Sequence, residues 1–124
     1  MELKDYFEQK HGLGVLSTCD SEGKINSAVY SRPVSVENGS IAFIMTSRKS
    51  YANIQQNPNA FYLFVEEGKG YKGKRLSLTK TEESTDQVLI ESLRRRFYSE
   101  EKEQAMSPLH LVYFRVDRER PLLG

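Results

Sequence analysis

A chain of 124 residues, 38% hydrophobic and 28% charged, can bury one core, which excludes a disordered segment. Its 18 Lys and Arg residues nearly balance 17 Asp and Glu residues, so no global charge attracts nucleic acid or membrane. One cysteine, no apolar run of membrane-spanning length and no signal-peptide core lead us to expect a cytoplasmic protein without an intramolecular disulfide.

The first third of the chain predicts one short helix and two strands. Leu3 to Lys10 place their apolar residues on one side of a helix. A strand follows at Gly14 to Thr18, and the turn residues 20–23 lead at hairpin distance into a second strand, Ile25 to Val36. Pro33 interrupts this second strand, which indicates a sheet edge or a bulge there.

The middle of the chain predicts a tight hairpin and a strand that turns directly into a helix. Asn38-Gly39 can supply the positive φ angles of a type I′ turn. The apolar run Ile41 to Met45 has the length of a buried strand, whereas Tyr51 to Gln55 fit helical spacing up to a stop at Asn57-Pro58.

The last part of the chain predicts three more strands and another helix. Two of these strands are Ala60 to Val65 and Arg75 to Thr81, which are rich in β-formers or alternate in polarity. Ser84 and Gln87 match a capping box that opens the helix, and Leu109 to Val116 form the final strand.

Six short strands with only small helices between them predict a mainly β fold rather than βαβ units. We expect an antiparallel barrel in which residues 1–124 form one domain, because we find no linker and no internal repeat.

The junction between the central strand and its helix carries two hydroxyls and two cations. Thr46 or Ser47 is a natural N-cap, which puts Arg48 and Lys49 in the first helical turn, where the helix dipole disfavours positive charge. An anion at this point would remove the conflict, because hydroxyls, cations and backbone N–H groups together bind phosphate. An ordinary cap with solvated charges explains the same residues, so the local pattern leaves both interpretations open.

A glycine-rich loop, Gly68 to Gly73, matches the dinucleotide fingerprint G-x-G-x-x-G. That fingerprint must open a helix, but the residues after it alternate like a strand, so we interpret the segment as a hairpin loop. Lysines around Tyr71 in this loop could bind single-stranded nucleic acid by stacking and charge. The nearly neutral net charge argues against a dedicated nucleic-acid binder.

The chain offers little chemistry of its own. Its two histidines, His11 and His110, have no metal-ligand spacing with the lone Cys19, and no G-x-S-x-G nucleophile elbow is present. If the protein is an enzyme, a bound cofactor should carry the redox chemistry.

Several motifs resemble those of the pyridoxamine 5′-phosphate oxidase-like, FMN-binding split-barrel family. Phe43-x-x-Thr46, then Ser47-Arg48-Lys49, and Asn57-Pro58 one helix later are similar to the family pattern. The resemblance implies a split barrel of the Greek-key type. It also implies that Arg48 and Lys49 grip the FMN phosphate while Thr46 and Ser47 donate from their hydroxyls.

A second motif, Arg32-Pro33-Val34-Ser35-Val36, resembles the family's Arg-x-Val-x-aliphatic strand. By this resemblance Arg32 reaches the phosphate, and the backbone around Val34 lies along the isoalloxazine edge. Two departures separate the chain from the true oxidases: Glu37 stands where the pattern has Lys, and there is no Trp to close over the flavin. The resemblance therefore speaks for the flavin site rather than for vitamin oxidase activity.

The resemblance further implies a homodimer with the flavin at the subunit interface and a small-molecule redox partner. We expect an FMN-dependent oxidoreductase or electron carrier, with no membrane partner and no nucleic-acid partner. Three alternatives stay open: the same fold with a deazaflavin or haem, a nucleic-acid-binding barrel that uses the lysine loop, and a ligand-free binding module.

Overall fold

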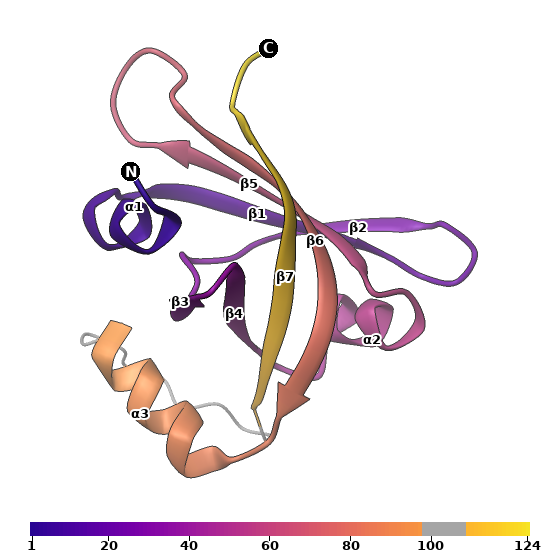
Figure 1. Ribbon diagram of the computed structural model, residues 1–124. Coiled ribbons are helices and arrows are strands. Elements are labelled where there is room, and N and C mark those ends of the chain that lie inside the picture. Colours follow the sequence, from indigo (N-terminus) through magenta and orange to yellow (C-terminus); the bar gives the residue numbers. More distant parts are fainter. Residues whose placement is uncertain (98–108) are drawn as a thin grey trace.

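The computed structural model describes residues 1–97 and 109–124, which form one antiparallel sheet and three short helices (Figure 1). The strand order is β2-β1-β5-β6-β7-β4-β3. The strands are β1 (Gly12–Cys19), β2 (Ile25–Val29), β3 (Ser35–Glu37), β4 (Ser40–Met45), β5 (Asn59–Glu66), β6 (Gly73–Ser84) and β7 (His110–Pro121). The helices are α1 (Leu3–Gln9), α2 (Lys49–Gln56) and α3 (Gln87–Phe97). None of these helices is long and apolar enough to cross a membrane.

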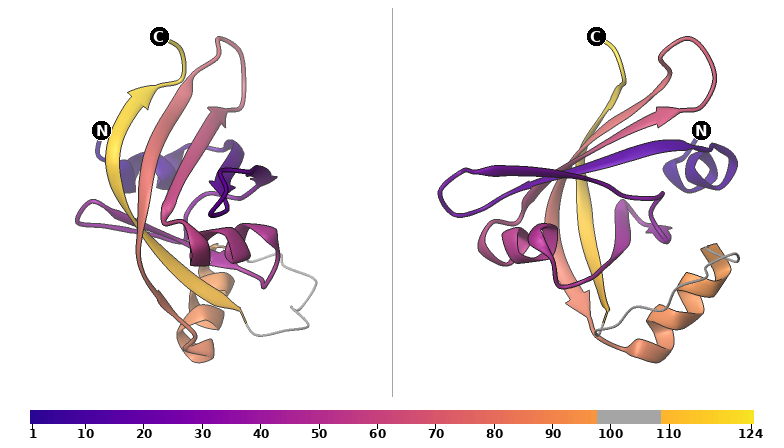
Figure 2. Two further views of the ribbon diagram at one scale, coloured as in Figure 1. Left: turned by 90° about the vertical axis from the view of Figure 1, so that its right-hand side faces the viewer. Right: turned by 180° about the vertical axis from the view of Figure 1, so that it is seen from behind.

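The sheet curls into an open barrel whose free edges are β2 and β3 (Figures 1 and 2). β4 and β5 follow one another in the chain but lie apart in the sheet, and α2 makes the crossing between them. The prediction of a mainly β, antiparallel split barrel is thus confirmed.

The described sheet has seven strands instead of the expected six, because residues 25–36 divide into β2 and β3. The Tyr30 N–H still bonds to the Gly14 carbonyl at 2.9 Å, after which the chain leaves β1. Pro33, which has no N–H to donate, lies in the gap. At Val34 the backbone N–H bonds to the Ala42 carbonyl of β4 instead. The proline marks a change of partner strand.

The predicted capping box at the start of α3 is wrong. Ser84 is the last residue of β6, and the helix is capped by Asp86, whose Oδ1 accepts from the N–H groups of Val88 at 3.1 Å and Leu89 at 3.2 Å. The Gln87 side chain turns away and donates to the Leu109 carbonyl at 2.9 Å. The strand therefore continues three residues beyond its predicted end at Thr81.

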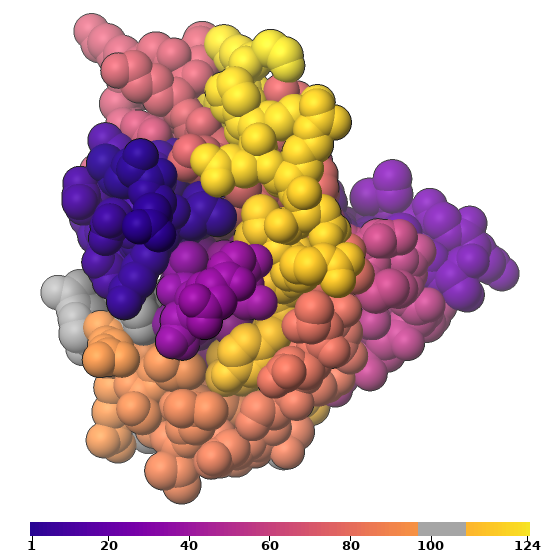
Figure 3. Space-filling model, viewed as in Figure 1, coloured from indigo at the N-terminus to yellow at the C-terminus, as the bar shows by residue number. Residues whose placement is uncertain are grey.

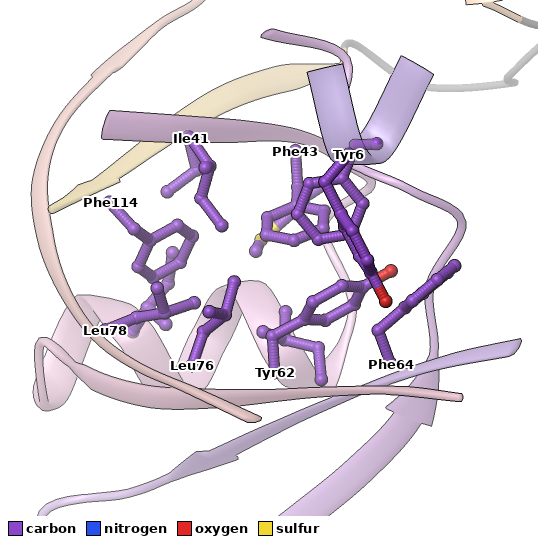
Figure 4. Close-up of a cluster of buried hydrophobic side chains, with 13 residues drawn as sticks. Tyr6, Ile41, Phe43, Tyr62, Phe64, Leu76, Leu78 and Phe114 are labelled. Carbon is purple, nitrogen blue, oxygen red and sulfur yellow. The ribbon is translucent and has the colours of Figure 1, made fainter. Parts of the chain in front are cut away.

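The main core fills the inside of the curled sheet with aromatic and aliphatic side chains (Figure 4). Phe43, Tyr62 and Phe114 lie at its centre, and α1 closes one mouth of the barrel with Tyr6 and Phe7. A second cluster on the outer face of β7, β4 and β3 packs under α3 and comprises Val34, Ala42, Ile90, Leu109 and Leu111.

Tyr62 binds the segment between β2 and β3 from inside the barrel. Its ring is fully buried, and its hydroxyl donates to the carbonyls of Tyr30 and Ser31, each at 3.1 Å. A Cβ at Gly14 would lie 2.0 Å from this hydroxyl oxygen, so β1 needs glycine at that position. This one side chain therefore positions the segment that leads to Arg32 and Val34.

We expect Tyr62→Phe to lower the free energy of unfolding by about 1–2 kcal/mol, because two carbonyls lose a donor while the ring remains. Urea unfolding followed by circular dichroism measures the change. Tyr71→Phe is the matched control, because Tyr71 is 76% exposed. Equal stability of the two variants would show that the Tyr62 hydroxyl does not hold this segment.

Candidate functional site

The start of α2 lies where β4 ends, at one end of the barrel. Arg48 is the N-cap residue, with extended backbone (φ −120°, ψ −160°), and no side chain caps the helix. The Arg48 N–H bonds to the Thr46 carbonyl at 2.8 Å, so Thr46 and Ser47 form a turn before the helix. The prediction that Thr46 or Ser47 caps the helix is therefore wrong, because the helix starts only at Lys49.

Hydroxyl and cationic side chains surround this uncapped end. Ser47, Arg48 and Lys49 are exposed and Thr46 is half-buried, so four of the five predicted phosphate ligands lie together here, without Arg32. Ser50 instead turns inward and is only 4% exposed. This arrangement gathers positive charge and free donors at one point of the surface.

Electrostatic effects on neighbouring groups place the two cations. Burial raises the pKa of Tyr30, and this rise is opposed by a hydrogen bond with Ser50 and by the charge of Arg48. The Lys24 backbone lowers the pKa of Asp20, and the charge of Lys49 acts in the same direction. Arg48 therefore lies within electrostatic reach of Tyr30, and Lys49 within reach of Asp20.

Behind Ser47 lies a histidine that the sequence did not single out as a site residue. Ser47 Oγ is 2.9 Å from His110 Nε2, and the Tyr51 ring stacks on the imidazole with 3.9 Å between ring centroids. His110 is the first residue of β7 and pairs with Met45, the last residue of β4. Ser47 and His110 stand 63 residues apart in the chain, so no local pattern could reveal the contact.

Glu83, near the end of β6, forms the back of this group. Lys80 Nζ binds its Oε1 at 2.8 Å, Gln55 Nε2 binds the same oxygen at 3.0 Å, and the Tyr51 hydroxyl donates to Oε2 at 2.6 Å. Burial alone would raise the pKa of Glu83, but the donors from Lys80, Tyr51 and Gln55 lower that pKa to about 2. Glu83 is therefore a fixed negative charge behind the imidazole.

Ser47, His110 and Glu83 follow the order of a hydrolytic triad without completing one. His110 Nδ1 lies 3.8 Å from Glu83 Oε2, which is beyond hydrogen-bond distance. Within residues 1–97 and 109–124, no group of three or more His, Cys, Asp or Glu side chains is arranged to hold a metal ion.

Arg32 and Val34 lie away from the start of α2. Arg32 Nη1 donates to the carbonyls of Phe7 at 2.7 Å and Lys10 at 3.0 Å, and thus holds the C-terminal end of α1. Figure 1 shows α1 and α2 at opposite ends of the barrel. Val34 is buried under α3. The contact of Arg32 with a phosphate stays a prediction.

A pocket with a volume of about 390 Å³ opens beside β3, between α1 and α3. Figure 3 shows the β3 segment on the surface between these two helices. The pocket mixes apolar walls with charged groups and is lined by Lys4, Phe7, Glu8, Pro33, Val34, Ser35, Val36, Glu37, Leu89, Leu93, Arg96 and Tyr113. Its volume is in the range of small-molecule sites.

The glycine-rich loop connects β5 and β6, so it opens a strand and not a helix, as the sequence predicted. Two of its basic neighbours bind to the C-terminal strand: Lys74 pairs with Glu119, and Arg75 donates to the carbonyls of Pro121 and Gly124. Tyr71 is exposed at the tip of the loop. The basic surface available to a nucleic acid is therefore smaller than the sequence indicated.

Comparison with known proteins places this geometry in a family. A family model described as pyridoxamine 5′-phosphate oxidase matches residues 2–122. An FMN-binding protein from Syntrophomonas wolfei subsp. wolfei has a TM-score of 0.75 and 17% identity, over 95% of this chain and 82% of that chain. HupZ from Group A Streptococcus has a TM-score of 0.74 and 19% identity, over 98% of this chain and 92% of that chain.

A protein described as an F420 reductase has a TM-score of 0.71 and 14% identity, over 97% of this chain and 98% of that chain. No curated protein sequence matches the chain. At such low identities the solved structures show a common fold and nothing more. The family model covers nearly the whole chain and confirms the resemblance drawn from the sequence: the protein belongs to the pyridoxamine 5′-phosphate oxidase family.

Proposed function

We propose that this protein binds FMN, with the phosphate at the start of α2, and acts as a flavin-dependent oxidoreductase or electron carrier. The observation that carries the proposal is the N-terminus of α2, which no side chain caps and which presents Ser47, Arg48 and Lys49 to solvent.

The charges at this helix end favour an anion. Unpaired N–H groups of the first turn give this end of α2 a partial positive charge, to which Arg48 and Lys49 add two full charges. The first turn holds no acidic residue that would compensate them. A phosphate would accept from the N–H groups and from the hydroxyls of Thr46 and Ser47, and would pair with both cations.

The isoalloxazine ring would extend from this phosphate toward the pocket beside β3. β3 is an edge strand of the described sheet, so one side of its backbone is not paired with another strand. The pocket lining includes Pro33 to Val36, which belong to the segment that the family resemblance assigns to the ring edge. Val34 lines this pocket, and Arg32, whose side chain binds the end of α1, stays a predicted phosphate ligand.

When bound, FMN supplies hydride or electron transfer at its ring. The polypeptide binds, orients and partly shields it. A small molecule that reaches the pocket beside β3 would be the redox partner. We keep a reducing, cytoplasmic location as part of the proposal, since the chain has a single cysteine.

The outer face of β2, β1 and β5 supports a homodimer. Val15 lies between Val29 and Leu63 in the strand register, and Leu13 is paired with Val65. Val29 is 70% exposed. An apolar sheet face of this kind needs a cover. A second copy of the chain would supply it, and the family resemblance implies that two subunits share each flavin.

The binding test also distinguishes FMN from other ligands that the same fold could hold. The F420 reductase neighbour speaks for a deazaflavin, which also carries a phosphate, and haem is the third ligand to compare. A nucleic-acid barrel would instead use the exposed residues Lys69, Tyr71 and Lys72 in the glycine-rich loop. Salt-dependent binding of a single-stranded oligonucleotide, without retained flavin, would favour that alternative.

Purified protein mixed with FMN and washed should retain the visible absorbance of the flavin. Lys49→Ala should weaken the binding of FMN by about 1.5–3 kcal/mol and the binding of riboflavin much less. Only FMN presents a phosphate to the charged contact. Titration of flavin fluorescence measures both affinities.

Lys72→Ala is the control, because it removes an exposed cation of the glycine-rich loop and should change neither affinity. A folded wild-type protein that retains no flavin would overturn the proposed function. Equal losses for FMN and riboflavin in Lys49→Ala would remove Lys49 from the phosphate site.

Val29→Asp should convert a dimer into a folded monomer, because a charge buried without a partner costs about 3–5 kcal/mol. Sedimentation velocity reports the change. Val88→Asp is the matched control on α3, since Val88 is 82% exposed but lies outside this sheet face. A dimer that persists in Val29→Asp would place the interface elsewhere.

A further inference from the structure

Ser47 has a second partner besides the proposed phosphate, and that partner can change its charge. Its Oγ lies 2.9 Å from His110 Nε2. The Tyr51 ring stacks on the imidazole, and the side chain of His110 is only 13% exposed. Histidine is the side chain that changes charge between about pH 5 and 8. The direction of the Ser47–His110 hydrogen bond therefore depends on protonation.

Glu83 determines which ring nitrogen carries the proton when His110 is neutral. His110 Nδ1 is buried, has no hydrogen-bond partner among the described residues, and lies 3.8 Å from Glu83 Oε2. An unprotonated Nδ1 would point its lone pair at this carboxylate. A proton on Nδ1 turns the repulsion into attraction, so neutral His110 carries its proton there and leaves Nε2 as an acceptor.

The two charge states of His110 give Ser47 opposite roles. Beside neutral His110, the Ser47 hydroxyl must donate to Nε2, and only its lone pairs face outward. Beside protonated His110, Nε2 donates to Ser47 Oγ, and the hydroxyl proton is free to bond elsewhere. The unprotonated oxygens of a phosphate only accept hydrogen bonds, so they are bound by the second arrangement and repelled by the first.

We infer that His110 is a positioning residue for the anion site: it takes up a proton when the FMN phosphate binds, and so turns Ser47 into a phosphate donor. The inference rests on the proposed function. It makes the phosphate-dependent part of the affinity stronger at acidic than at alkaline pH.

Charged groups from each neighbouring element act on this protonation. From β6, Glu83 favours the proton on His110, and Lys80 opposes it, although Lys80 is paired with that same carboxylate. From α2, the Tyr51 ring stacks on the imidazole and its hydroxyl binds Glu83, and Arg48 and Lys49 flank Ser47 in the chain. The β4 residue paired with His110 is Met45, which is uncharged. The phosphate is thus the added charge that favours protonation.

The test measures FMN and riboflavin affinities at pH 6 and pH 8 in wild type, Ser47→Ala and His110→Gln. A charge-assisted hydrogen bond accounts for about tenfold or more in affinity. Ser47→Ala should therefore lose about tenfold or more in FMN affinity at pH 6 and little at pH 8. A serine that served as an ordinary ligand would lose the same factor at both values.

His110→Gln keeps a donor near the Nε2 position but cannot take up a proton. The ratio of wild-type to His110→Gln affinity for FMN should be about tenfold larger at pH 6 than at pH 8, because a nearby opposite charge changes a protonation equilibrium by about that factor. Titration of the FMN phosphate itself cancels in this ratio. Riboflavin should show no such change.

Three results would overturn the inference, and only one of them would also overturn the proposed function. A pH-independent loss in Ser47→Ala, or a riboflavin profile that matches the FMN profile, would remove the coupling and leave the proposed function intact. Absence of FMN binding in folded wild-type protein would overturn the proposed function and this inference with it. If His110→Gln fails to fold, Ser47→Ala decides alone, since Ser47 is an exposed residue.

Discussion

Antiparallel pairing of β7 with both β4 and β6 is the constraint on which the candidate site depends. It sets Met45, at the end of β4, opposite His110, and Glu83, near the end of β6, opposite Val112. Met45 and Val112 are buried in the main core, so a slip by one residue would turn these side chains away from it, which fixes the register. The helix that leaves β4 must then begin beside a histidine and a carboxylate that are distant in sequence.

The same sheet positions the other end of the proposed cofactor site. Tyr62 holds the carbonyls of residues 30 and 31, and Arg32 binds the end of α1, so the chain reaches β3 along a defined path. β3 remains an edge strand, with α1 and α3 on either side of its pocket. The start of α2, where we propose the phosphate, and the pocket beside β3 are therefore both positioned by the same sheet.

Local sequence signals sufficed for the strands and for the gathering of Thr46 to Lys49, because alternation, turn residues and adjacent polar residues act over a few positions. They failed where a distant partner decides the outcome. Pro33 marked an irregularity, but the change of partner from β1 to β4 made two strands of one. The cap of α3 depends on how far β6 continues beside β7. The contact between Ser47 and His110 follows only from strand register.

We propose that the N-terminus of α2 holds the phosphate of FMN, and a crystal structure of the protein grown with FMN would show where that phosphate lies. We expect phosphate oxygens within hydrogen-bond distance of the first-turn N–H groups of α2 and of Ser47 Oγ, with the ring lying toward β3. A bound FMN whose phosphate lies away from Ser47, Arg48 and Lys49 would exclude this site.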